Sequence, residues 1–169
     1  MKLSRFLFGV ALVAALAAAG AVRPAGAAAA MPAALSTLVG SWACTYTGPK
    51  GSSHSSYTIT KISDLWVEGV GQESAYGDRP THKSFFLIGY DPKKHMYVSM
   101  GGDTLAGDYG TSTAPASMTA MTMTYVNSYP ADPTHEKDVW TYTPTTIAIA
   151  SSWTEKGKNM TGKSSCTKQ

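Results

Sequence analysis

The sequence predicts an all-β protein, an antiparallel β-barrel of about 8–10 strands with one short helical turn near its N-terminal end. Three observations support this prediction. Beyond residue 40, Thr, Ser, Tyr, Val, Ile and Trp occur in short runs that Gly, Pro and Asp separate, a pattern typical of a sandwich or barrel. No stretch in that region has the length and the periodicity of a long helix. The two cysteines lie near opposite ends of it, where the first and last strands of a closed sheet would meet.

The first 30 residues have the pattern of a secretory signal. Lys2 and Arg5 precede an apolar run over residues 6–22, and a tract of small residues with A-x-A sites follows. A membrane anchor is the alternative, but the Ala-rich run is short for a bilayer span. We therefore expect residues 1–30 to be removed and residues 31–169 to form a single domain. The product is expected to be periplasmic or secreted, with no membrane span.

The net positive charge of the chain lies in that N-terminal segment. Removal of Lys2, Arg5 and Arg23 from the 14 basic residues leaves 11, equal to the 11 acidic residues. Arg79 is then the remaining arginine. A nearly neutral chain with one arginine lacks a positive surface for phosphate backbones, so we expect no nucleic-acid partner.

Turn residues divide the rest of the chain into ten segments with the composition of strands. Residues 33–38 (AALSTL) favour one helical turn. Asp91-Pro92 predicts one tight hairpin and Gly157 predicts another. We expect strands at residues 41–48, 55–62, 65–75, 83–90, 94–101, 107–113, 117–127, 136–143, 145–153 and 159–167.

Alternation of side chains along each strand predicts which residues face the interior. Trp42, Cys44 and Tyr46 share one face of the first strand, and Cys166 lies on the more apolar face of the last. Two cysteines in an exported chain favour a Cys44–Cys166 disulfide, with two buried thiols as the alternative. A closed barrel would place these strands side by side, although an open sandwich could also bring the chain ends together.

Residues 35–167 resemble the calycin superfamily, which contains the lipocalins and the fatty-acid-binding proteins. Gly40-Ser41-Trp42, after a short turn, is similar to the G-x-W motif of that superfamily. The segment LIGYDPKKHMYVSMGGDTLAG (87–107) looks like a hairpin of small bacterial nitrobindin-like barrels of unknown function. The resemblance implies a barrel of a ligand-carrier type whose base is formed by Leu38, Gly40 and Trp42.

The chain departs from these families at three points. Lipocalins carry an arginine over the G-x-W tryptophan, where the last strand here offers Lys163 or Lys168. They also have a C-terminal helix, which we do not expect here. Nitrobindin-like haem barrels present an axial histidine near the C-terminal end, whereas no histidine follows His135. We therefore expect no haem and no other cofactor.

The sequence contains no motif of a known catalytic class, so whether the protein is an enzyme stays open and a binding protein is favoured. A G-x-S-x-G nucleophile elbow is absent. DPTHEKD (132–138) mixes carboxylates and an imidazole without the spacing of a metal site, and GGDTLAGDYG (101–110) lacks the alternating ligands of an EF-hand. We expect no metal, and we expect His54, His82 and His95 to be exposed loop residues.

Polarizable and aromatic side chains are the remaining candidates for a binding site. Methionines fill gaps in cores but also line adaptable apolar sites, and a small barrel can enclose one small ligand. Face parity predicts an interior ligand site lined by Met96, Met100, Met121, Met123, Tyr125 and Trp153. We expect this site to bind a small apolar or amphipathic molecule.

Two alternatives to this function stay open. The same cavity could serve a haem protein or a small-molecule enzyme. A solid structural or interaction barrel is the other alternative, since KSFFLIGYD (83–91) has bulky residues on both faces and its outer face is expected to be covered or to lie in an interface.

Overall fold

The computed structural model describes residues 31–105, 109–115, 120–129 and 135–169. The helix and the ten strands predicted from the sequence are all present, with their ends shifted by a few residues. The elements are α1 (Ala33–Leu38), β1 (Gly40–Gly48), β2 (Gly51–Ser63), β3 (Trp66–Glu73), β4 (His82–Asp91), β5 (Met96–Asp103), β6 (Tyr109–Pro115), β7 (Ala120–Tyr129), β8 (Lys137–Tyr142), β9 (Thr146–Glu155) and β10 (Lys158–Lys168). No helix in the described ranges is long and apolar enough to cross a membrane.

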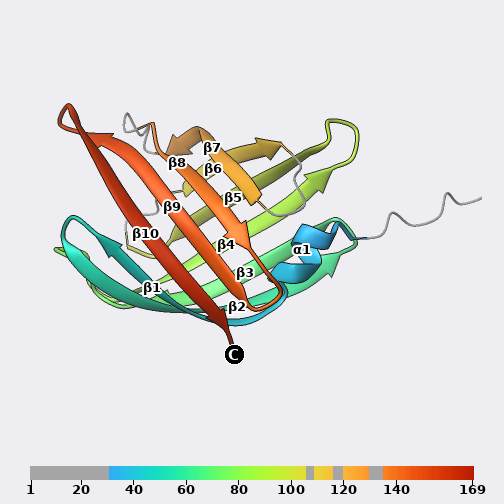
Figure 1. Cartoon of the computed structure of the whole chain (residues 1–169), viewed down its shortest axis with the longest axis horizontal. Helices are drawn as coiled ribbons and strands as arrows, with labels where there is room; N and C mark the ends of the chain where they lie inside the picture. Colours follow the sequence, from blue (N-terminus) through green and yellow to red (C-terminus); the bar gives the residue numbers. More distant parts are fainter. Residues whose placement is uncertain (1–30, 106–108, 116–119, 130–134) are drawn as a thin grey trace, which may run out of the picture.

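The strands form a closed antiparallel barrel. Each strand pairs with its neighbours in the sequence, and β1 also pairs with β10. The helix α1 lies at one end of the barrel, and the β1–β2 and β9–β10 turns lie at the opposite end (Figure 1). Closure gives every strand a hydrogen-bonded neighbour on both sides, so the sheet has no open edge. The prediction of a barrel rather than a sandwich is confirmed.

A disulfide joins the first and last strands where they pair. Cys44 on β1 and Cys166 on β10 are direct partners in the strand register, and the structure contains the bond between them. Both side chains are buried. The predicted pairing is confirmed, and with it the prediction that the two cysteines face the same side of the sheet.

Trp42 and α1 close one end of the barrel. The indole of Trp42 is 1% exposed, and its Nε1–H donates to the carbonyl oxygen of Leu38 over 2.7 Å. Leu35 and Leu38 are fully buried beside it. The Nζ atom of Lys168 lies 5.3 Å from the centroid of the Trp42 ring and donates to the carbonyl oxygen of Thr37. A cation thus covers the face of the tryptophan ring.

The interior face of β5 differs from the prediction. Tyr97 is 3% exposed, whereas Met100 is 40% exposed, so the odd-numbered residues of this strand face inward. The expectation that Met96 and Met100 line the interior is therefore wrong. The physical reason is that the more apolar face of β5 lies outside, where Met100 pairs in register with Leu87 of β4.

An apolar strip runs over the outer faces of β3, β4 and β5. Phe85 is 45% exposed and pairs in register with Val70, which is 56% exposed. Trp66 on the same face of β3 is 37% exposed, and Met100 completes the strip. The described residues of this chain leave these four side chains accessible, so the expected cover over the outer face of residues 83–91 does not come from them.

We predict that the disulfide makes a large contribution to stability. The bond links residues 122 positions apart, so it removes much of the conformational freedom of the unfolded chain. The double variant Cys44→Ser/Cys166→Ser should lose about 4 kcal/mol in free energy of unfolding, measured by urea denaturation. A loss below about 1 kcal/mol would show that the crosslink hardly constrains the unfolded state.

A second prediction concerns the closed end. Trp42→Ala should lower the free energy of unfolding by about 3–5 kcal/mol, because it empties a fully buried aromatic site. Trp66→Ala is the matched control, since Trp66 is 37% exposed on the outer face, and it should cost clearly less than Trp42→Ala does. Similar losses in the two variants would contradict the assignment of Trp42 as the plug of the barrel.

Candidate functional site

The barrel encloses a cavity of about 600 Å³, within the range of about 300–1,000 Å³ that is usual for small-molecule sites. It extends from the buried ring of Trp42 to Lys50 and Arg79, whose side chains are 52% and 49% exposed. Its apolar wall is formed by the disulfide together with Tyr57, Ile59, Phe86, Ile88, Trp140, Ile147, Ile149 and Trp153. The cavity therefore has an apolar interior and a charged rim.

Two glycines on β3 make room for aromatic rings that line the cavity. The ring of Tyr57 packs on Gly71, where a Cβ atom would lie 2.6 Å from the carbonyl oxygen of Ser56. The ring of Phe86 packs on Gly69 in the same way, and its centroid is 5.8 Å from that of Tyr57. The absence of side chains at these two positions thus fixes where both rings lie.

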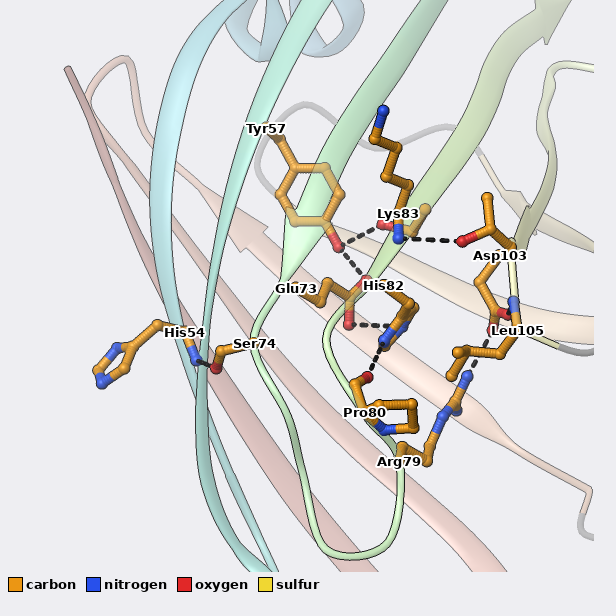
Figure 2. Close-up of polar contacts among 12 residues, drawn as sticks. His54, Tyr57, Glu73, Ser74, Arg79, Pro80, His82, Lys83, Asp103 and Leu105 are labelled. Carbon is orange, nitrogen blue, oxygen red and sulfur yellow. Dashed lines mark hydrogen bonds and ion pairs between the residues drawn. The ribbon is translucent and has the colours of Figure 1, made fainter.

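A polar cluster, formed by Tyr57, Glu73 and His82, lies on this wall (Figure 2). Glu73 at the end of β3 is the register partner of His82 at the start of β4. The phenol of Tyr57 donates to Oε1 of Glu73 over 2.5 Å and accepts a hydrogen bond from Ser84. Nε2 of His82 lies 3.6 Å from Oε2 of Glu73. Three strands thus bring a phenol, a carboxylate and an imidazole into one cluster.

The hydrogen-bond partner of His82 shows which of its two ring nitrogens carries a hydrogen. Nδ1 of His82 lies 3.0 Å from the carbonyl oxygen of Pro80, which can only accept, so Nδ1 carries the hydrogen (Figure 2). In the neutral ring Nε2 is then an acceptor. His82 is 8% exposed, so the expectation that it is an exposed loop residue is wrong. The sequence around it is polar, but His82 begins a strand and faces the interior.

The phenols on the cavity wall keep their protons over a wide pH range. Burial raises the pKa of Tyr57 above its ordinary value, and the carboxylate of Glu73 raises it further because a phenolate would face a like charge. Burial also raises the pKa of Tyr46 to about 12, with contributions from Tyr76, Glu136 and Asp138. Both phenols are therefore hydrogen-bond donors at neutral pH.

The cations at the rim have carboxylate partners of their own. Arg79 forms an ion pair with Asp103, whose side chain is 13% exposed (Figure 2). Lys50 lies 3.0 Å from Asp78, and both side chains are largely exposed. Neither Asp78 nor Asp103 lines the cavity. The exposed Lys50–Asp78 pair adds little stability, and both carboxylates offset the positive charge at the rim.

The residues predicted to bind ligand occupy different places. Trp153 lines the cavity, and Met123 is 2% exposed within the barrel. Met96 and Met100 lie on the outer face. The side chains of Met121 and Tyr125 lie outside the described part of the structure.

Sequence reasoning missed the polar cluster. On β3 the residues that face inward are Val67, Gly69, Gly71 and Glu73, so a carboxylate at the end of a face of small residues was the available signal. On β2, Ser55 is the register partner of Glu73, and Tyr57 lies two residues further along the same face. Alternation along β2 would therefore have placed Tyr57 close to Glu73.

The described histidines do not fit the role of a haem ligand. A histidine ligand must present an accessible ring nitrogen to the iron. The side chain of His82 is 5% exposed, and its Nε2 atom stands beside Glu73. Among the described residues, His54, His95 and His135 are exposed and do not line the cavity. The described part of the chain also contains no group of three or more His, Cys, Asp and Glu side chains arranged to hold a metal ion.

The raised pKa of Tyr57 predicts a loss of stability at alkaline pH. The folded state retains this proton after the unfolded chain, with a pKa near 10, has released it. The contribution of Tyr57 is therefore complete below about pH 10 and declines as the pH rises toward the folded pKa. Between about pH 9 and pH 11, the free energy of unfolding should fall by about 1.4 kcal/mol more in the wild type than in Tyr57→Phe. Urea denaturation measures both falls, and equal falls would contradict a buried phenol.

Comparisons with known proteins support the fold alone. No protein-family model matches the chain, and no curated protein matches it. Rv2717c from M. tuberculosis is similar in structure, with 14% sequence identity and a TM-score of 0.59 over 83% of this chain and 99% of that chain. Two redesigned β-barrels match less well. One, mFAP1 bound to DFHBI, has 16% identity and a TM-score of 0.47 over 80% of this chain and 98% of its own. The other has 15% identity and a TM-score of 0.48 over 83% and 98%.

Proposed function

We propose that this protein binds a small amphipathic molecule inside its barrel. The apolar part of the molecule would lie against the aromatic wall, and its polar part would reach the Tyr57–Glu73–His82 cluster. The observation that carries the proposal is the cavity of about 600 Å³, which has an apolar interior and a polar rim. A binding site of this type has a mostly apolar lining and a few placed polar groups.

The size of the cavity supports a binding role over a solid core. Protein interiors are close-packed, and voids much larger than a water molecule are few in a domain. The wall of this cavity carries the rings of Tyr57, Phe86, Trp140 and Trp153. A ligand that covers this wall gains roughly 25 cal/mol for each Å² of apolar surface removed from water, before the costs of association.

Our proposal also includes the cellular location of the protein and its family. The signal-like residues 1–30 and the Cys44–Cys166 disulfide both support export to an oxidising compartment, either the periplasm or the medium. The position of Trp42 over the base of a closed barrel, with Lys168 over its ring, supports a calycin-like origin. The domain would then comprise residues 31–169.

A small-molecule enzyme is the second candidate function. Glu73 and His82 are side chains of the types that transfer protons in catalysis, and both line the cavity. Recovery of a bound natural ligand in chemically unchanged form after incubation with the protein, checked by mass spectrometry, would favour binding alone. Conversion of that ligand would favour the enzyme.

The binding proposal predicts that a neutral hydrophobic fluorophore enters the cavity. N-phenyl-1-naphthylamine should bind with micromolar affinity and quench the tryptophans that line the wall. Ile149→Trp, which adds bulk inside the cavity, should weaken binding at least about tenfold, a change of about 1.4 kcal/mol. Val139→Trp is the matched control, because Val139 is 38% exposed on the outer face of the barrel, and it should bind as the wild type does. Fluorescence titration measures all three affinities.

Two results would count against this function. Absence of fluorophore binding to the folded wild type would leave the outer apolar strip as the leading interaction surface. Equal weakening by Ile149→Trp and Val139→Trp, at unchanged melting temperatures, would place the binding site outside the cavity.

A further inference from the structure

We propose that the bound molecule carries a protonated amine, which the carboxylate of Glu73 receives near the rim of the aromatic cavity. This inference deepens the proposed function and rests on it. The ligand class would be an alkyl or aryl ammonium compound with an apolar body.

The first observation that supports the inference is the distribution of charge around the cavity. Lys50 and Arg79 line the rim, but each has a carboxylate partner outside the cavity lining. Glu73 brings a carboxylate into the lining itself. With the two rim cations offset, the cavity favours a positive group over a negative one.

The environment of Glu73 carries the second step. Its side chain is 30% exposed, so a ligand can reach the carboxylate. The hydrogen bond from Tyr57 to Oε1 orients the group, and Ser84 in turn donates to Tyr57. The carboxylate is thus held in place before a ligand arrives, and the hydrogen bond that it would accept from an ammonium group is of the stronger, charge-assisted kind.

The relation between His82 and Glu73 carries the third step. Because Nδ1 of His82 donates to Pro80, Nε2 is the ring nitrogen that faces Glu73, and at 3.6 Å it is too far from Oε2 for a hydrogen bond. A ligand group with several N–H donors can supply the hydrogen bond that His82 does not give to Oε2. An alkylammonium group has three such donors and no acceptor, whereas a carboxylate ligand has acceptors alone.

The aromatic rings that line the same cavity are the fourth observation in support of the inference. Tyr46, Tyr57, Tyr76 and Trp153 all line the cavity, and the rings of Tyr46 and Tyr76 stand edge to face with their centroids 5.1 Å apart. The faces of such rings attract cations, most strongly where water is excluded. The same wall that accepts an alkyl chain therefore also tolerates a positive head group.

Three ligands of ten carbon atoms each test the inference on the wild-type protein. They are decylammonium, decanol and decanoate, which carry different head groups, and isothermal titration calorimetry at neutral pH gives a dissociation constant for each, below micelle-forming concentrations. Decylammonium should bind about tenfold more tightly than decanol, the gain expected from one charge-assisted hydrogen bond. Decanoate should bind most weakly. Binding of decanoate as tight as that of decylammonium, or tighter, would overturn the inference.

A pair of variants on one strand assigns the preference to Glu73. Glu73→Gln keeps the shape of the side chain and removes its charge, so the preference for decylammonium over decanol should fall below about twofold. Glu68→Gln is the matched control, because Glu68 lies exposed on the outer face of β3, and it should keep the tenfold preference. An undiminished preference in folded Glu73→Gln would overturn the assignment. If that variant does not fold, the ranking of ligands on the wild type decides.

The outcomes also separate this inference from the proposed function. If none of the three ligands and no fluorophore binds, the cavity is not a binding site, and both proposals fail. If decanol and the fluorophore bind but decylammonium gains nothing over decanol, the binding function stands and the cationic ligand class is wrong.

Discussion

The pairing of β1 with β10 is the constraint on which the rest of this structure depends. An antiparallel meander of ten strands has two open edges until its first and last strands meet, and here the Cys44–Cys166 disulfide clamps them where they pair. Closure of the sheet creates an enclosed barrel interior. Trp42 and α1 then fill one end of it, and the other end stays lined by polar side chains. The cavity is thus a consequence of closing a barrel at one end.

The candidate site depends on the register of that sheet more than on any local motif. Tyr57, Glu73 and His82 belong to three consecutive strands, and each faces inward only because of its parity along its own strand. The pairs Ser55–Glu73 and Glu73–His82 place them at one level of the barrel. A slip of one residue in β3 would turn Glu73 outward and remove the carboxylate from the cavity. The same slip would also turn away from the interior the two glycines on which the rings of Tyr57 and Phe86 pack.

The sequence was sufficient for the fold because strand composition and turn residues are local signals. All ten strands and the helical turn at residues 33–38 were predictable in this way, and the Cys44–Cys166 pair followed from the presence of two cysteines in a chain with a signal-like N-terminus. The site was less predictable, since it depends on which face of each strand turns inward. On β5 the assumption that the more apolar face is buried put Met96 and Met100 inside. The interior of this barrel is instead aromatic and partly polar around a cavity, so apolarity is a poor guide to direction there.

The mixed character of the interior explains why a carboxylate can lie in it. A carboxylate in a partly enclosed apolar space loses hydration, and this cost must be offset by hydrogen bonds or by an opposite charge. Tyr57 supplies a hydrogen bond to one oxygen of Glu73, and the raised pKa of Tyr57 keeps that donor protonated. The other oxygen has His82 at 3.6 Å, which is longer than a hydrogen bond. Compensation inside the protein is therefore incomplete on the side of Oε2, and a cationic ligand that enters through the rim would complete it.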